Sequence, residues 1–336
     1  MNTPLSVLDL APVGAGMTAR EALRNSTELA QAAERWGYTR YWFAEHHGMP
    51  SIASSAPEIL IAHAAANTST IRVGSGGIML QNHVPLKAAE AFHTLEALYP
   101  DRIDLGIGRA PGTDPTTSAA LHPFSPAQFA EQLHELVGLS RGSLPSDHPF
   151  HRVRVIPSDV SLPPIWLLGS SGASARFAGE LGLGYSFASH FSPTPAGPAI
   201  AAYKAAFRPS ETFPRPHAIL GAAVICAETR ERAEYLAASF DLMWVRINRG
   251  EFKPIPTPEE AMAYHYTEME RAIAAKHRSL VFVGTAAEVK EQIEAACSDA
   301  DADEVIITSI IHSHDERIKC YELLAHVFKM EGRVNS

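Results

Sequence analysis

Glu45, His46 and His47 follow one another directly after a short apolar run, Tyr41–Ala44. A carboxylate beside two imidazoles can exchange protons near neutral pH or bind a metal ion. The same triplet can also be polar residues that end a strand, and the triplet alone does not separate these interpretations. Strand alternation puts Glu45 and His47 on one face and His46 on the other, so Glu45 and His46 converge only if the chain turns there.

Small or cationic residues stand at the ends of three further predicted strands. They are Gly76, Gly77, Gly108, Arg109, Ser170, Ser171 and Ser174. Glycines inside the strand 71–80 indicate a bulge or a ligand that approaches the backbone closely. An arginine after the strand 102–108 can bind an anion or stack on a planar group. Serines at the start of a helix leave backbone N–H groups free to bind phosphate.

Apolar segments that alternate with helical patterns predict the elements that carry these residues. The predicted strands are 5–10, 40–47, 71–80, 102–108, 165–168, 185–188, 219–227 and 304–309. Such alternation over one α/β chain predicts a (β/α)8 TIM barrel with insertions, in which the carboxyl ends of all strands meet at one end. A doubly wound sheet is the alternative, and the lack of Gly-x-Gly-x-x-Gly after the first strand disfavours it.

The length of 336 residues and the hydrophobic content of 46% suit one barrel domain over residues 1–336. The segment 142–164 is rich in Pro, Ser and His and lacks a helical period, so we expect a surface excursion there. The barrel does not require the helix predicted after Thr257. Residues 248–279 are therefore interpreted as an insertion that could act as a lid.

The charge and cysteine content restrict the partners and the compartment. A net charge of −9 argues against nucleic acid or an anionic membrane as a partner, because those surfaces require a basic face. Cys226, Cys297 and Cys320 are widely spaced without a Cys-x-x-Cys pair, which indicates reduced thiols. No apolar run reaches the ~20 residues of a membrane span, and no signal peptide is evident. We expect a soluble cytoplasmic protein.

Several blocks together resemble the bacterial luciferase-like flavin-dependent monooxygenases, over almost the whole chain. The blocks are Leu8–Pro12, Gly37–His47, Arg72–Gly77 with His83–Pro85, Arg102–Arg109, and Gly284–Thr285. Each block is a weak motif, and their order and spacing together are specific. The resemblance implies that reduced FMN, supplied by a separate flavin reductase, reacts with oxygen to give a peroxyflavin that oxidises a small organic substrate.

The resemblance also implies roles for individual positions. Gly76 and Gly77 match the position of a non-proline cis peptide that lies against the flavin ring in the family. Glu45 matches an acidic residue near the ring, and His46 matches the active-site histidine. Arg109 matches the phosphate-binding arginine, and the serines at 170, 171 and 174 match the anion cradle. Gly108 replaces a cysteine of bacterial luciferase and Ser170 an acidic residue, which argues against light emission from long-chain aldehydes.

Other functions remain open from the sequence. Relatives that use F420 transfer hydride, and some relatives bind flavin without catalysis. A metal-dependent barrel hydrolase is suggested by 16 His, but the chain has no His-Glu-x-x-His motif, and His312-Ser313-His314 follows the last strand. No metal is therefore expected. The Ala-rich helices at 57–67 and 86–98 suggest a homodimer, since small side chains let helices approach closely, although they can equally pack on their own barrel.

Overall fold

Eight parallel strands close into a barrel in the computed structural model, which describes residues 3–121 and 126–332. The ring runs β10-β1-β2-β3-β5-β6-β7-β8 and closes where β8 pairs with β10. The predicted (β/α)8 barrel is thereby confirmed. Its strands are β1 (Leu5–Asp9), β2 (Arg40–Phe43), β3 (Arg72–Ser75), β5 (Ile103–Gly108), β6 (Ile165–Gly169), β7 (Gly184–Phe187), β8 (Ala218–Ala227) and β10 (Glu304–Thr308).

Two short strands depart from the predicted pattern. The predicted strand 71–80 is interrupted at Gly76 and Gly77, after which β4 (Ile78–Met79) pairs with β5. The strand β9 (Val281–Thr285) pairs with the second half of β8, whereas the first half of β8 pairs with β10. β9 therefore extends the sheet beside the barrel without entering the ring.

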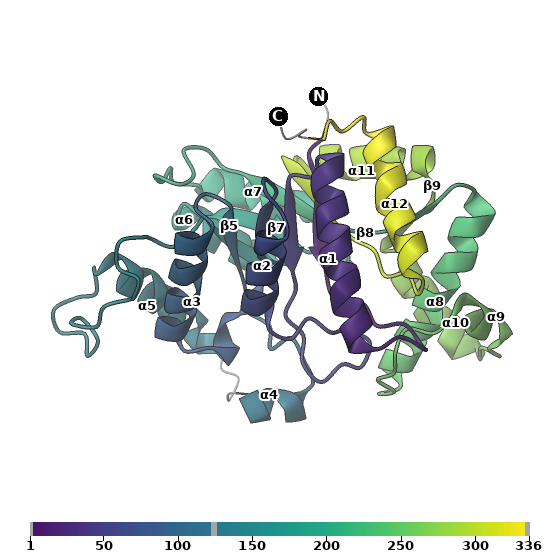
Figure 1. The fold of residues 1–336 in the computed structure, drawn as a ribbon, viewed down its shortest axis with the longest axis horizontal. Helices are drawn as coiled ribbons and strands as arrows, with labels where there is room; N and C mark the ends of the chain where they lie inside the picture. Colours follow the sequence, from purple (N-terminus) through teal and green to yellow (C-terminus); the bar gives the residue numbers. More distant parts are fainter. Residues whose placement is uncertain (1–2, 122–125, 333–336) are drawn as a thin grey trace.

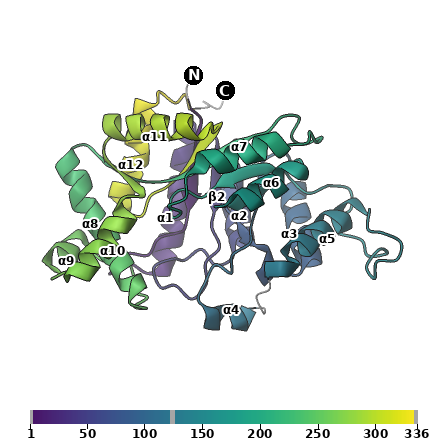
Figure 2. The same ribbon diagram turned by 180° about the vertical axis from the view of Figure 1, so that it is seen from behind.

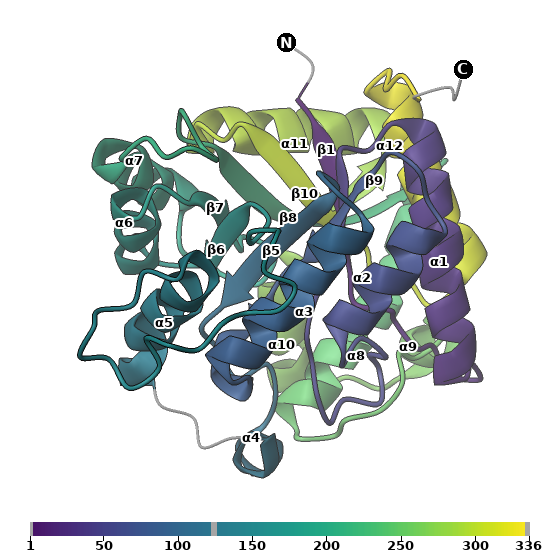
Figure 3. The ribbon, with the colours of Figure 1, turned by 60° about the vertical axis from the view of Figure 1, so that its left-hand side comes forward.

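Helices surround the strands, as Figure 3 shows, with α2 and α3 in front, α6 and α7 on one side, and α1 and α12 on the other. Seen from behind in Figure 2, α7 lies beside α6, and α10 lies beside α8. The helices are α1 (Ala19–Trp36), α2 (Pro57–Ala66), α3 (Pro85–Leu98), α4 (Pro115–Leu121), α5 (Phe129–Arg141), α6 (Gly172–Glu180), α7 (Ala196–Ala206), α8 (Arg230–Asn248), α9 (Pro258–Ala263), α10 (Glu268–Arg278), α11 (Ala286–Ala300) and α12 (His314–Val327). No described helix is both long and apolar enough to span a bilayer.

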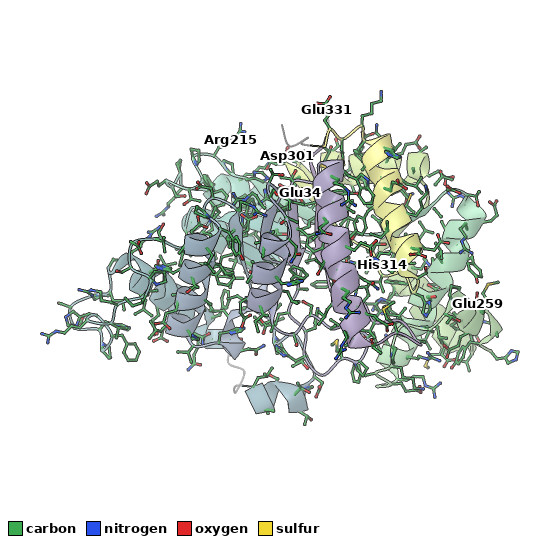
Figure 4. The ribbon with its side chains drawn as sticks, in the orientation of Figure 1. Glu34, Arg215, Glu259, Asp301, His314 and Glu331 are labelled. Atoms are coloured by element: carbon green, nitrogen blue, oxygen red, sulfur yellow. The ribbon has the colours of Figure 1, made fainter. Side chains whose placement is uncertain are left out.

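Residues at the ends of the elements identify the two ends of the barrel. Arg215 and Asp301 precede β8 and β10, and both lie at the end that carries the two chain termini (Figure 4). Glu34 lies at the same end, where its carboxylate accepts N–H groups of Ser69 at 2.8 Å and Ile71 at 3.0 Å and so fixes the start of β3. The carboxyl ends of the strands therefore lie at the opposite end, together with α4 (Figure 1).

Alternation along β2 separates two apolar environments. Tyr41 and Phe43 pack in the core between the strands and the helices, whereas Trp42 and Ala44 belong to a second cluster inside the barrel. Arg40 also points inward, where its guanidinium bonds Glu304 at 2.7 and 2.9 Å and Asp104 at 2.8 Å. Paired charges thus fill the amino end of the barrel, because a buried charge is tolerated only when it is paired.

The two predicted insertions have different structures. Residues 142–164 form no helix or strand. Between residues 248 and 279 the chain forms α9 and α10, which pack against α8. The backbone of Ile255 bonds Val13 and Ala15, in the loop that follows β1 at the carboxyl end of the barrel. Figure 1 shows α9 and α10 towards the end that carries α4, and a role as a lid stays a prediction.

Candidate active site

The Glu45 carboxylate binds four hydrogen-bond donors at the carboxyl end of β2. It accepts bonds from His47 Nε2 at 2.8 Å, Asn82 Nδ2 at 3.0 Å, the Met79 backbone N–H at 2.8 Å and His83 Nε2 at 2.9 Å. The side chain is fully buried. Burial acts to raise the pKa of Glu45, but the hydrogen bonds from His47 and His83 outweigh it and lower the pKa to about 2. Glu45 therefore stays ionised and anchors the turn after β4, and it has no proton to give at neutral pH.

His46 faces away from Glu45, as alternation predicts. Its Nδ1 donates to the Gly112 carbonyl at 3.1 Å, because a carbonyl oxygen can only accept. Burial lowers the pKa of His46 below its ordinary value. The neutral ring therefore carries its proton on Nδ1 and leaves Nε2 as an acceptor. The chain makes no turn that would join Glu45 and His46 as an acid–base pair, and Glu45 pairs with His47 and His83 instead.

Gly76 and Gly77 form a cis peptide where β3 passes into β4, as the resemblance implied. A Cβ at Gly77 would lie 2.7 Å from the Gly106 carbonyl carbon, and a Cβ at Gly76 would lie 2.6 Å from Leu8 Cδ1. Distances this short exclude a side chain at either position without movement of the neighbouring strand or core. The segment therefore presents bare backbone at this end of the barrel.

Arg109 and Ser174 line one cavity of about 210 Å³ between β6, α5 and α6. Its lining residues are Arg109, Ala127, Phe129, Ala130, Leu167, Leu168, Ala173, Ser174 and Phe177. Arg109 is exposed and forms no ion pair with any described residue. Ser171 precedes α6 without capping it, so the N–H groups of the first turn have no side-chain partner. A guanidinium and an uncapped helix start in one cavity suit an anion.

The other predicted cofactor residues are neighbours of this lining. Ser171 accepts a hydrogen bond at its carbonyl from Ser174 Oγ at 2.9 Å, and Ser170 lies in the turn between β6 and α6. Gly108 ends β5 beside Arg109, and a Cβ there would lie 2.8 Å from Met79 Sδ. A cysteine at position 108 would therefore require Met79 to move.

The sequence assigned no site role to three polar residues of this region, Asn82, His83 and His190. Asn82 and His83 lie outside the predicted strand ends and reach Glu45 only through the turn after β4. His190 follows β7 and packs against Gly221 of β8. The sequence signals that point to His190 are its position just after a predicted strand and the glycine, Gly221, inside the next predicted strand. In the described part of the chain, no group of three or more His, Cys, Asp or Glu residues is placed to hold a metal ion.

The chain belongs to the luciferase-like monooxygenase family, because the model of that family matches residues 3–303. Among curated proteins, "Uncharacterized protein YvbT" of Bacillus subtilis (strain 168) is 46% identical over 98% of this chain and 97% of its own length. "Luciferase-like monooxygenase" of Escherichia coli (strain K12) is 41% identical over 96% of both chains. "N-acetyl-S-alkylcysteine monooxygenase" of Bacillus subtilis (strain 168) is 35% identical over 96% of this chain and 97% of its own.

Solved structures agree with this assignment. Apo-MsnO8 superposes with a TM-score of 0.87, at 38% identity and over 98% of both chains. The oxygenating constituent of 3,6-diketocamphane monooxygenase from Pseudomonas putida, in complex with FMN, has a TM-score of 0.68 at 18% identity and covers 100% of this chain and 99% of its own. An F420-dependent secondary alcohol dehydrogenase also scores 0.68, at 15% identity, with 96% of this chain and 98% of its own covered. These two distant likenesses concern the fold alone.

Proposed function

We propose that the protein is an FMN-dependent monooxygenase, which uses reduced FMN from a separate flavin reductase and molecular oxygen to oxidise a small organic substrate. The observation that carries this proposal is the cavity in which Arg109 meets the uncapped start of α6. The cavity is lined in part by β6, which pairs with β5, and β5 pairs in turn with the strands on either side of Gly76 and Gly77. Membership of the luciferase-like monooxygenase family supports the same reaction class.

The residues present fit a phosphorylated flavin. Arg109, Ser174 and the first-turn N–H groups of α6 would hold the phosphate, because they offer positive charge and donors without competing carboxylates in the cavity lining. The bare backbone at Gly76 and Gly77 would allow a flat ring to approach. Reduced FMN, when bound, supplies the two electrons that activate oxygen, so that one oxygen atom enters the substrate and the other leaves as water.

The protein's own part would be to bind, orient and exchange protons. His46 Nε2 is the acceptor that could take a proton, since Nδ1 is held by Gly112. Glu45 would act as a positioning residue, which holds Met79, Asn82 and His83 against the end of β2. The paired charges of Arg40, Asp104 and Glu304 close the opposite end of the barrel.

The decisive experiment is a titration of apo-protein with FMN, anaerobically reduced FMN and F420, followed by absorbance and fluorescence. We expect FMN or its reduced form to bind, and Arg109→Ala to weaken binding at least about tenfold, the loss of one charged hydrogen bond to phosphate. Arg141→Ala, at the exposed end of α5, is the matched control and should bind as the wild type does. Binding of F420 alone would favour a hydride-transfer enzyme, and binding of none would refute the cofactor site.

Turnover separates an enzyme from a flavin-binding protein without catalysis. The named relative at 35% identity makes N-acetylated S-alkylcysteines the first substrates to test. The assay supplies reduced FMN from a purified reductase and follows the oxidised product by mass spectrometry. FMN binding without product from these or other thioethers would favour the non-catalytic alternative.

We also propose a homodimer formed through α2 and α3. Ile59 near the start of α2 and Val84 just before α3 are 66% and 62% exposed, at the starts of two helices that pack side by side. A second copy would cover these apolar side chains. His93 of α3 does not belong to this face, because it is buried against Pro157 and Ser140 of its own chain.

A further inference from the structure

His190 projects its ring into the mouth of the barrel. In β8, Ile219 belongs to the cluster inside the barrel, so Gly221, two residues later, faces the same way. A Cβ at Gly221 would lie 2.7 Å from His190 Nδ1 and 3.2 Å from Cε1. The glycine therefore leaves the interior space that the His190 imidazole occupies. The same ring meets Phe191 edge to face at a centroid distance of 4.8 Å.

His46 reaches the same mouth from the opposite wall. β2 and β7 are four strands apart in either direction round the ring of eight. His46 continues the inward side of β2 after Trp42 and Ala44, so its ring faces the mouth that also holds His190. Although they lie 144 positions apart in the sequence (190 minus 46), the two imidazoles share this mouth, and the charge of a protonated His46 lowers the pKa of His190.

Both rings are neutral at pH 7. Burial and the charge on His46 lower the pKa of His190, and they outweigh the Gly221 backbone, which acts to raise it. The pKa of His190 falls to about 4. Burial likewise lowers the pKa of His46, and the other titratable groups that act on His46 are Glu45 and His47. A neutral imidazole offers one N–H donor and one lone pair. The Gly221 backbone lies beside the ring, but no described residue makes a hydrogen bond of good geometry to the buried His190 Nδ1.

We propose that His190 is a further residue of the active site, which forms with His46 a pair of imidazoles across the barrel mouth that hydrogen-bonds a protic O–H or N–H group of the substrate. His46 contributes the lone pair of Nε2, because Nδ1 donates to Gly112. The pair accepts one proton from that group and returns it, so no oxidant or reductant is needed. A buried polar atom without a partner in a family of enzymes is explained by a ligand that supplies the partner. The role in substrate binding rests on the proposed monooxygenase function.

The first test needs no cofactor. Nitrogen-15 NMR of selectively labelled histidine in the full-length apo-protein follows the ring of His190 between pH 3 and 8, a range that brackets its pKa of about 4. We expect His46→Asn to raise the apparent pKa of His190 by about half a pH unit, because a nearby positive charge is removed. His265→Asn, at an exposed position between α9 and α10, is the control and should leave His190 unchanged. If near-ultraviolet circular dichroism shows that His46→Asn is not folded, His46→Gln is used in its place.

The second test supplies the protein with reduced FMN and an N-acetylated S-alkylcysteine, whose amide N–H and carboxyl are protic groups. We expect His190→Asn to lower kcat/KM at least about tenfold and to shift its pH profile, while FMN binds within twofold of the wild type. Because the amide of asparagine stands near the position of Nδ1 and that of glutamine near Nε2, His190→Asn should keep more of the substrate affinity than His190→Gln, and neither variant should keep the pH profile. A His190 pKa that ignores His46, or an unchanged kcat/KM in His190→Asn, would overturn the proposal. Failure of FMN to bind the wild type would refute the proposed function and leave the NMR result standing.

Discussion

Replacement of Glu45 by Gln removes the buried charge that holds the turn after β4. The pKa of Glu45 is lowered from 4.5 to about 2, since the hydrogen bonds from His47 and His83 outweigh burial. Each pH unit corresponds to about 1.36 kcal/mol, so ionised Glu45 stabilises the folded protein by about 3 kcal/mol. The glutamine amide keeps one acceptor oxygen, but its NH2 group points at partners of Glu45 that are themselves hydrogen-bond donors. We therefore expect Glu45→Gln to lower the free energy of unfolding by about 3 kcal/mol at pH 6.

The pH dependence of this loss has a definite sign. Because the folded-state pKa of Glu45 is depressed, its stabilisation is present above about pH 4.5 and is lost as the pH falls towards 2. Burial acts to lower the pKa of His83, but the hydrogen bond to Glu45 outweighs burial and raises this pKa above 6.5. The stability that protonated His83 contributes is therefore present below pH 6.5 and is lost as the pH rises further. The difference between wild type and variant should be largest between these limits and shrink to about 2 kcal/mol at pH 3.5.

Urea denaturation followed by circular dichroism, at several pH values from 3.5 to 8.5, measures this difference. Glu291→Gln, at an exposed position of α11, is the matched control and should change the free energy of unfolding by less than about 0.5 kcal/mol. A loss for Glu45→Gln below about 0.5 kcal/mol at pH 6 would refute the reasoning. A loss that stays constant down to pH 3.5 would show that charge is not its cause.

Three further predictions concern packing, a buried ion pair and assembly. Gly77→Ala should destabilise the folded protein by about 1–3 kcal/mol, because the added Cβ would lie 2.7 Å from the Gly106 carbonyl carbon. The control is Gly172→Ala, whose Cβ would meet open space, and equal urea midpoints of the two variants would contradict the prediction. Arg317→Met should cost about 3–5 kcal/mol, since it leaves Asp9 buried without its 2.5 Å partner, and an unchanged melting temperature would exclude that cost. Ile59→Glu should convert a dimer into a monomer in analytical ultracentrifugation, and a wild-type monomer would refute the proposed dimer.

Much of the fold was predictable because local patterns decide it. The sequence Thr285-Ala286-Ala287-Glu288 has the pattern of a capping box, and the box forms at the start of α11. The strand 71–80 was predicted as one element with a bulge, or a ligand close to the backbone, at its glycines. Whether a strand continues through Gly76 and Gly77 depends on a neighbouring strand, and here β5 pairs with separate segments before and after them.

The site was predictable to the level of strand ends. The parallel barrel puts the carboxyl ends of its strands together, and Arg109 and Ser174 do line one cavity. The predicted roles of these residues stay predictions. The chemical state of Glu45 could not be read from its neighbours in sequence, because Asn82 and His83 reach it from 37 and 38 residues away.

The sequence by itself determined which way each side chain of β2 faces, because a strand alternates whatever lies around it. That rule already separated Glu45 and His47 from His46. Only the tertiary structure decided what each of them meets. Glu45 becomes a fixed anion because a turn folds over it, and His46 faces the same mouth as His190 because the closed ring brings the ends of opposite strands together. The register and closure of a barrel depend on contacts between distant segments, and no local pattern encodes them.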